Sequence, residues 1–164
     1  MTRGSAQARH DPAPRLSYTL RPALPADRPR VTGLLRQADL PLDGIPDDLE
    51  GFLVAQLPDG RVCAAGGLER HGTTALLRST VVDPSCRACG VGGALVAELL
   101  RRAESSGALD VVLLTTTAQA WFPRFGFERI AWSDVPSEAL GSAEFRGACP
   151  QTAVVMRKRV GERE

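Results

Sequence analysis

The 164-residue sequence has almost no lysine, no excess of either charge and no long apolar run. Its formal net charge of +1 at pH 7 gives no electrostatic signal for nucleic acid or a membrane surface. No apolar run approaches the roughly 20 residues of a membrane span, and no apolar segment near the N-terminus indicates a signal peptide. Lys158 is the only lysine, a bias that fits either anion binding or genome composition. We expect a cytoplasmic protein without nucleic-acid or membrane partners.

The four cysteines predict no zinc site, because Cys86 and Cys89 form a single Cys-x-x-Cys pair. A zinc site usually needs a second close pair of Cys or His, and the sequence offers none. Two interpretations stay open. The pair consists of incidental thiols in a loop, or it joins Cys149 as soft ligands of a trivalent metalloid. We expect reduced thiols, as in other cytosolic proteins, and no bound metal.

The length predicts one domain with a substantial core. Residues 1–16 contain few apolar side chains to bury, so they are expected to form a disordered leader before a domain over residues 17–160. Apolar and β-branched runs predict strands over residues 17–21, 52–56, 61–69, 74–82, 110–117, 127–131 and 152–157. A helix is expected around Val31, Leu34 and Leu35, with shorter ones over residues 47–50, 118–124 and 135–140.

The chain is organised around residues 74–103. A strand over residues 74–82 is broken by Asp83-Pro84, and a glycine-rich loop then opens a helix with Leu95, Leu99 and Leu100 at helical spacing. The helix start offers unpaired N–H groups and the positive end of the helix dipole, so the loop suits a phosphate or pyrophosphate. With the apolar strand at 110–117, this region predicts a right-handed β-α-β unit with parallel strands.

The glycine loop matches neither of two common nucleotide-binding patterns. Its glycines fall as Gly90-x-Gly92-Gly93, which differs from the dinucleotide fingerprint, and no Lys-Ser/Thr follows them as in a P-loop. The longer string Val82-x-Pro84-x-x-Arg87-x-x-Gly90-x-Gly92 resembles the acetyl-CoA signature of the GNAT N-acetyltransferases. A later segment, Trp121-Phe-Pro-Arg-Phe-Gly-Phe127, strengthens this resemblance.

The resemblance implies an α/β fold with a mixed, mostly antiparallel sheet splayed after the central strand. It implies an acyltransferase that moves an acetyl group from acetyl-CoA to the amine of a small molecule, as a monomer or homodimer. The branch annotated from arsenic-resistance operons looks closest, through segments at 76–79, 113–118 and 143–150. The acceptor that this branch implies is an amino-acid-like toxin or an arsenical.

The resemblance also places the cofactor. The pantetheine arm of acetyl-CoA would pair with the backbone of Thr80, Val81 and Val82, and the pyrophosphate would meet Arg87, Ala88, Cys89, Gly90, Val91, Gly92 and Gly93. Thr115 and Phe122 lie where many relatives carry a cofactor-contacting asparagine and an acid tyrosine. Phenylalanine cannot donate a proton. Ala88 stands where a glycine is frequent, which is tolerated unless its φ must be positive.

The expected chemistry is attack by a neutral amine on the thioester. The backbone N–H of Thr80 is the candidate contact for the oxyanion, and Glu69 is the candidate base, or else an exposed carboxylate at a strand end. Arg78 either binds a substrate anion or forms a structural ion pair, with Glu69 as a candidate partner. Glu144 and Arg146 either recognise the acceptor or pair within a loop. Besides the metalloid protein above, the remaining alternative is a non-catalytic acyl-CoA sensor, which Phe122 favours.

Overall fold

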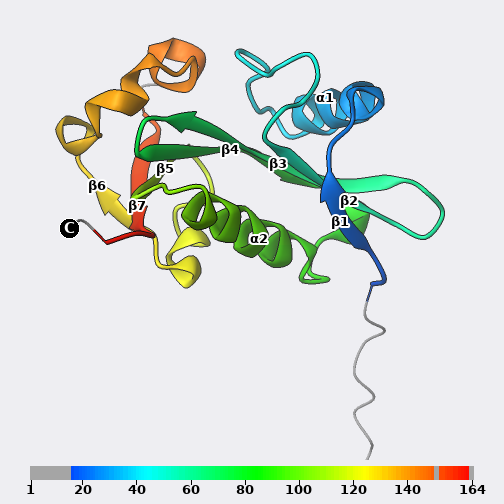
Figure 1. The fold of residues 1–164 in the computed structure, drawn as a ribbon. Helices are drawn as coiled ribbons and strands as arrows, with labels where there is room; N and C mark the ends of the chain where they lie inside the picture. Colours follow the sequence, from blue (N-terminus) through cyan, green and yellow to red (C-terminus); the bar gives the residue numbers. More distant parts are fainter. Residues whose placement is uncertain (1–15, 150–151, 163–164) are drawn as a thin grey trace, which may run out of the picture.

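The computed structural model describes residues 16–149 and 152–162. Within them, seven strands form one mixed sheet in the order β1-β2-β3-β4-β5-β7-β6 (Figure 1). All neighbouring pairs are antiparallel except β4 and β5, which run parallel. The strands are β1 (Thr19–Pro22), β2 (Phe52–Gln56), β3 (Val62–His71), β4 (Thr74–Val82), β5 (Asp110–Thr115), β6 (Glu128–Ile130) and β7 (Val154–Arg159).

The expected fold class and the parallel pairing inside the central unit are confirmed. Each predicted strand is present, because strand periodicity and the turn residues agree at every reversal. The short helix expected over residues 47–50 is wrong. Those residues form turns, since the backbone of Leu49 is left-handed at φ 57° and a continuous helix cannot pass through it.

Two longer helices cover opposite faces of the sheet (Figure 1). Helix α2 (Val91–Ser105) packs Leu95 and Leu99 in one core cluster, and α1 (Arg28–Gln37) packs Leu34 in another. Side chains alternate between the clusters along β2, where Leu53 belongs to the α2 cluster and Val54 to the α1 cluster. Each fully buried leucine or valine contributes roughly 1.5–3 kcal/mol by leaving water.

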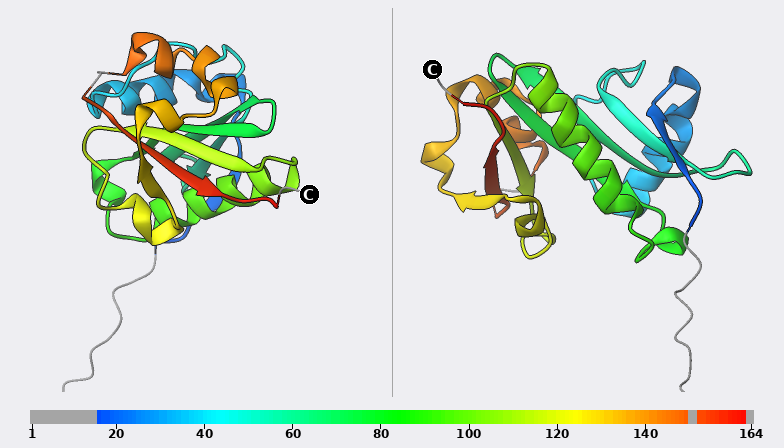
Figure 2. Two further views of the ribbon diagram at one scale, coloured as in Figure 1. Left: turned by 90° about the vertical axis from the view of Figure 1, so that its left-hand side faces the viewer. Right: turned by 60° about the horizontal axis from the view of Figure 1, so that its bottom comes forward.

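The remaining elements are short turns of helix. They are η1 (Pro25–Asp27), η2 (Pro84–Cys86), η3 (Phe122–Phe125), η4 (Trp132–Asp134), η5 (Ser137–Gly141) and η6 (Glu144–Ala148). Of the helix expected over residues 118–124, only the last part is helical, as η3. The helix expected over residues 135–140 corresponds to η5. In the right-hand view of Figure 2, β6 and β7 lie on one side of α2, and β1 and α1 lie on the other.

The parallel strands β4 and β5 separate after three residue pairs. Thr74, Ala75 and Leu76 pair with residues 110–112, and no further pair follows. Because β4 continues to Val82, its C-terminal half has β3 on one edge and no described strand on the other. This divergence opens a cavity between the two strands.

Among the described residues, no helix is both long and apolar enough to cross a membrane. The leader expected over residues 1–16 lies almost wholly outside the described residues, which begin at residue 16.

Candidate active site

A cavity of about 830 Å³ lies where β4 and β5 separate. Its walls come from the end of β4, the loop and first turn of α2, the end of β5, η3, and the C-terminal segment around η6. The cavity therefore joins the central strand to the glycine-rich loop. Its lining includes residues 77–82, 86–88, 90–93, 113–115, 117–118, Trp121, Phe122, Arg124, Phe125, Glu144 and Cys149.

One wall is a free strand edge. Val81 and Val82 pair with Ala65 and Ala64 of β3, which occupies only one edge of β4. A free edge presents N–H and C=O groups to any extended chain that carries amides. The pantetheine arm of coenzyme A is such a chain, so the wall fits it as an added strand.

The same strand contains a β-bulge beside the cavity. Val81 pairs with Ala65 and Arg78 with Gly67, so three steps along β4 oppose two along β3. Ser79, within the bulge, has a left-handed φ of 57°. A bulge interrupts the ladder and leaves backbone groups unpaired. It lies at the level of Thr80, the residue predicted to offer an N–H to the oxyanion.

The loop after β4 ends at the N-terminus of α2. Asp83 accepts hydrogen bonds from the backbone N–H and the hydroxyl of Ser85, at 2.9 and 2.7 Å. The first hydrogen bond of the helix runs from Ala94 N to Gly90 O, 3.1 Å. The backbone N–H groups just before Ala94 therefore have no acceptor within the helix. Together with the helix dipole, they form an anion site suited to a pyrophosphate.

The loop holds two residues in left-handed conformations. Gly90 has φ 80° and Ala88 has φ 63°. Ala88 therefore has the positive φ at which an alanine in place of a glycine is strained. A left-handed backbone costs an L-residue roughly 1–2 kcal/mol. Gly92 is closely packed, since a Cβ there would lie 3.2 Å from Val82 Cγ2 and 3.6 Å from Trp121 Cζ2.

The aromatic side chains of Trp121 and of η3 form the cavity wall beside the first turn of α2. The ring centroid of Trp121 lies 5.0 Å from that of Phe122 and 4.8 Å from that of Phe125, both edge-to-face. The guanidinium of Arg124 lies 5.5 Å from the centre of the Trp121 ring. Sequence reasoning assigned a role to Phe122 and missed Trp121, Arg124 and Phe125. The Trp-Phe-Pro-Arg-Phe run, with four aromatic or basic side chains in five residues, is the sequence signal for them.

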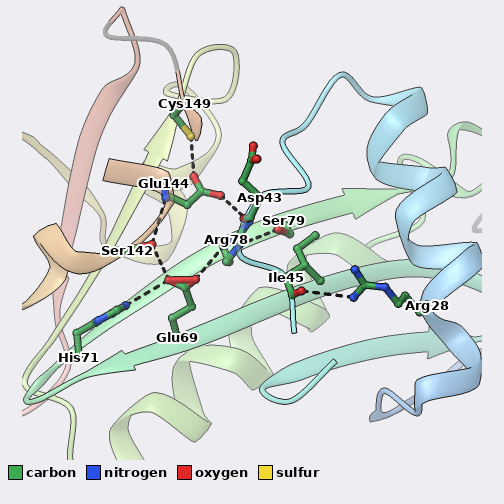
Figure 3. Close-up of polar contacts among 10 residues, drawn as sticks. All are labelled: Arg28, Asp43, Ile45, Glu69, His71, Arg78, Ser79, Ser142, Glu144 and Cys149. Atoms are coloured by element: carbon green, nitrogen blue, oxygen red, sulfur yellow. Dashed lines mark hydrogen bonds and ion pairs between the residues drawn. The ribbon is translucent and has the colours of Figure 1, made fainter. Parts of the chain in front are cut away.

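At the other end of the cavity, Arg78 lies between two carboxylates (Figure 3). Its side chain is 0% exposed and donates to Glu69 Oε1 at 2.9 Å, to the Asp43 carbonyl at 2.6 Å and to Ser79 Oγ at 3.0 Å. Glu144 Oε1 lies 3.3 Å from the guanidinium. The ion pair of Arg78 with Glu69, one of the two interpretations left open by the sequence, is therefore present.

The two carboxylates have opposite electrostatic environments. Partial burial opposes ionisation of Glu69, but hydrogen bonds from Ser142, Arg78 and His71 outweigh it and lower the pKa of Glu69. Burial raises the pKa of Glu144 and outweighs the bond from Cys149 and the charge of Arg78. Burial and the adjacent carboxylate also raise the pKa of the Cys149 thiol, to about 12.

Most of the residues predicted to bind the cofactor line this one cavity, and three site residues do not. Cys89 is exposed, and its thiol bonds to the Arg87 carbonyl. Glu69 is absent from the lining and lies behind Arg78. Arg146 lines a separate pocket with Trp132 and Phe145. The predicted residues on the cavity wall are Arg78, Thr80, Val81, Val82, Arg87, Ala88, Gly90, Val91, Gly92, Gly93, Thr115, Phe122 and Glu144.

The three-thiol metalloid site is not formed. Cys86 is buried, Cys89 is exposed, and the Cys149 thiol donates to Glu144 Oε2 at 2.6 Å. Across residues 16–149 and 152–162, no three His, Cys, Asp or Glu side chains lie so as to hold a metal ion. The alternative in which Cys86, Cys89 and Cys149 together hold a metalloid is therefore not supported, because the fold places these thiols in different environments.

The model of the acetyltransferase (GNAT) domain family matches residues 48–129, half of the chain. This match includes β2 to β5, the glycine loop, α2 and η3. The chain belongs to the GNAT acetyltransferase family. A search of curated protein sequences gives no significant match.

Solved structures show the same fold. Rv2747 from Mycobacterium tuberculosis, in complex with CoA and NLQ, is 25% identical with a TM-score of 0.74, over 86% of this chain and 98% of that one. N-acetylglutamate synthase from Neisseria gonorrhoeae, with coenzyme A and N-acetyl-glutamate, is 19% identical with a TM-score of 0.75; the match covers 92% of this chain but 37% of that one. A GNAT acetyltransferase from Staphylococcus aureus is 16% identical with a TM-score of 0.70, over 88% and 100%.

Proposed function

We propose that this chain transfers the acetyl group of acetyl-CoA to the amine of a small molecule in the cytoplasm. The observation behind the proposal is that the free edge of β4, its bulge and the N-terminus of α2 share one cavity. These features suit, in order, the pantetheine amides, the thioester carbonyl and the pyrophosphate. Membership of the GNAT family and the CoA complex of Rv2747 support the same ligand.

In the proposed reaction, the neutral nitrogen of the amine attacks the thioester carbonyl carbon. A C–N bond forms, the C–S bond breaks and coenzyme A leaves as a thiolate. The negative charge that develops on the carbonyl oxygen is met by a backbone N–H near Thr80. Pairing of the pantetheine arm along Val81 and Val82 would hold the thioester in place for the attack. A free thiol has a pKa of about 8.5, so the thiolate is a competent leaving group at neutral pH.

For the acceptor we propose an amino-acid-like amine, with arsenic-containing analogues as a subset to be tested. A thiol reagent that detects released coenzyme A, applied with a panel of such amines, tests this directly. We expect at least one class of amine to raise the release rate about tenfold or more over acetyl-CoA alone. Calorimetry with acetyl-CoA, run in parallel, measures binding separately from turnover.

One observation favours a second function. Phe122 lies on the cavity wall, where a phenylalanine offers no proton to the departing thiolate. A protein that holds acyl-CoA as a sensor needs no such proton. Tight acetyl-CoA binding in calorimetry with no release of coenzyme A for any amine would support the sensor and overturn acetyl transfer.

A further inference from the structure

One buried cation, Arg78, lies against two carboxylates beside the cavity (Figure 3). Arg78 already donates to Glu69, to the Asp43 carbonyl and to Ser79, with Glu144 at 3.3 Å. With both carboxylates ionised, the three side chains sum to one negative charge. The guanidinium is thus compensated from within the protein, and this end of the cavity favours a positively charged group over an anion.

The two carboxylates are not equivalent. Three side chains, Arg78, Ser142 and His71, lie within 2.9, 2.6 and 3.2 Å of Glu69, which is absent from the cavity wall. Glu144 is on the cavity wall and is 5% exposed. Its carboxylate accepts a hydrogen bond from the Cys149 thiol at 2.6 Å and has a longer contact, 3.3 Å, with Arg78. Glu144 is therefore the carboxylate that a molecule in the cavity can reach.

We propose that Glu144 receives the acceptor amine as an ammonium ion and removes the proton that the amine must lose before it attacks the thioester. This inference rests on the proposed acetyl transfer and names the base for it. The ammonium gives one proton to the Glu144 carboxylate, which passes it to solvent. After the C–N bond forms, the nitrogen loses a second proton. The coenzyme A thiolate that leaves when the C–S bond breaks takes up this proton, so coenzyme A is released as a thiol.

The surroundings of Glu144 suit a base. The charged and titratable groups that face it are Arg78 from β4, Glu69 from β3, Asp43 from the loop before β2, and Cys149 from its own segment. Burial and the two other carboxylates raise the pKa of Glu144, against the opposing effects of Cys149 and Arg78. A carboxylate with a raised pKa is a stronger base, closer to the working pH of the reaction.

Cys149 is a positioning residue in this scheme. Its thiol has a pKa raised to about 12, so it stays protonated at neutral pH and donates to Glu144 Oε2. That bond fixes one carboxylate oxygen. The other oxygen, Oε1, has only the longer 3.3 Å contact with Arg78 and is the one we assign to the ammonium.

The test compares Glu144→Gln with Glu69→Gln, using Glu128→Gln on exposed β6 as a control. The measurement is kcat against pH at saturating acetyl-CoA and amine, with acetyl-CoA affinity and thermal melting for each variant. We expect Glu144→Gln to lower kcat about 10²–10⁴-fold, to lose the ascending limb of the pH profile, and to keep acetyl-CoA affinity within about threefold. Glu69→Gln should keep the limb, and Glu128→Gln should match the wild type.

Two outcomes would overturn the assignment: an ascending limb and a rate within threefold of wild type in Glu144→Gln, or loss of the limb in Glu69→Gln alone. If Glu144→Gln does not fold, Glu144→Asp replaces it. That variant should keep the limb at a reduced kcat, and a limb unchanged in both position and rate would count against the proposal. A wild-type protein that binds acetyl-CoA and acetylates no amine is a different result, because it overturns the proposed function itself.

Discussion

The guanidinium of Arg30 on α1 lies 2.5 Å from the carboxylate of Asp83, in the loop between β4 and α2. Arg30 also donates through Nε to the Val62 carbonyl of β3 at 2.9 Å. The pair therefore connects the helix on one face of the sheet to the loop that leads to the anion site. Because Asp83 also caps η2 through Ser85, one carboxylate fixes the path of the chain into α2.

Replacing Asp83 by alanine should destabilise the protein and weaken acetyl-CoA binding. Loss of a capping carboxylate costs about 1 kcal/mol, which lowers the melting temperature by roughly 2–4 °C in a chain of this size. Calorimetry should show weaker binding of acetyl-CoA, since the loop before α2 loses its anchor. Asp59→Ala is the matched control, because Asp59 accepts from Arg61 N in the β2–β3 turn, away from the cavity.

The effect of Asp83 should also depend on pH. Hydrogen bonds from Ser85 and then Arg30 lower the pKa of Asp83 to about 2, from an ordinary value of 3.8. A lowered pKa means that the stabilisation is complete above about pH 4 and is lost as the pH falls towards 2. The melting difference between wild type and Asp83→Ala should therefore narrow over that interval. A constant difference would show that the charge of Asp83 contributes nothing.

Gly92→Asp should abolish acetyl-CoA binding while the protein stays folded. The new side chain would begin 3.2 Å from Val82 Cγ2 and add a negative charge where the pyrophosphate is proposed to bind. An acidic residue in the first turn favours a helix, so the loss of binding should not come from unfolding of α2. Calorimetry and thermal melting together separate these effects.

Gly33→Asp provides the comparison. Gly33 lies in α1, and a Cβ there would meet nothing within 4 Å. This variant introduces the same side chain into a helix at a position that does not line the cavity, and acetyl-CoA affinity should stay within about twofold of wild type. Unchanged affinity in Gly92→Asp would place the pyrophosphate elsewhere.

Much of the fold could be predicted because local signals agree with one another. Strand β4 was found at its true bounds, as its β-branched run ends at Asp83-Pro84, and β5 was correctly expected beside it as a parallel partner. Leu49 was misjudged for the opposite reason. Leu49 is buried in the α1 cluster and has a left-handed φ. Both depend on tertiary packing, and the local sequence contains no pattern that predicts them.

The lining of the cavity was predictable beside the glycine loop and not beside Arg78. Residues close in sequence and joined by one motif, such as Arg87 and Gly92, line the cavity together. By contrast, the nearness of Glu144 to Arg78 depends on how the C-terminal segment folds back over β4. Local sequence spacing does not predict a contact between segments so far apart in the chain.

Phe122→Tyr should change kcat by less than about tenfold. Phe122 is 7% exposed on the cavity wall, with the Trp121 ring at 5.0 Å and the Phe127 ring at 5.7 Å, so a tyrosine can keep the same packing. General acid catalysis is worth about 10²–10⁴-fold only where departure of the thiolate limits the rate. Phe125→Tyr, on the same wall, is the control for the added hydroxyl. A gain of several hundredfold in Phe122→Tyr alone would mean that thiolate protonation is limiting.

Arg78→Met should be severely destabilising, and more so at high pH than at low pH. Removing one partner of a buried ion pair costs roughly 3–5 kcal/mol, because the half-buried Glu69 and the buried Glu144 would lose their cation. In the wild type the pKa of Glu69 is lowered, so its stabilisation is lost as the pH falls below about 4.5. Without Arg78 both carboxylates favour the protonated form, and the variant regains stability relative to wild type as the pH falls.

Urea denaturation at pH 8 and at about pH 4 measures this difference, and Arg101→Met is the control. Arg101 is paired with Glu98 on the surface of α2, with 63% of its side chain exposed, and such an exposed pair contributes little to stability. Arg78→Lys should recover only part of the loss, since an ammonium cannot reproduce the forked contacts of a guanidinium with Glu69, Ser79 and the Asp43 carbonyl. If Arg78→Met loses no more stability than Arg101→Met at pH 8, the buried network does not hold the C-terminal segment against β4.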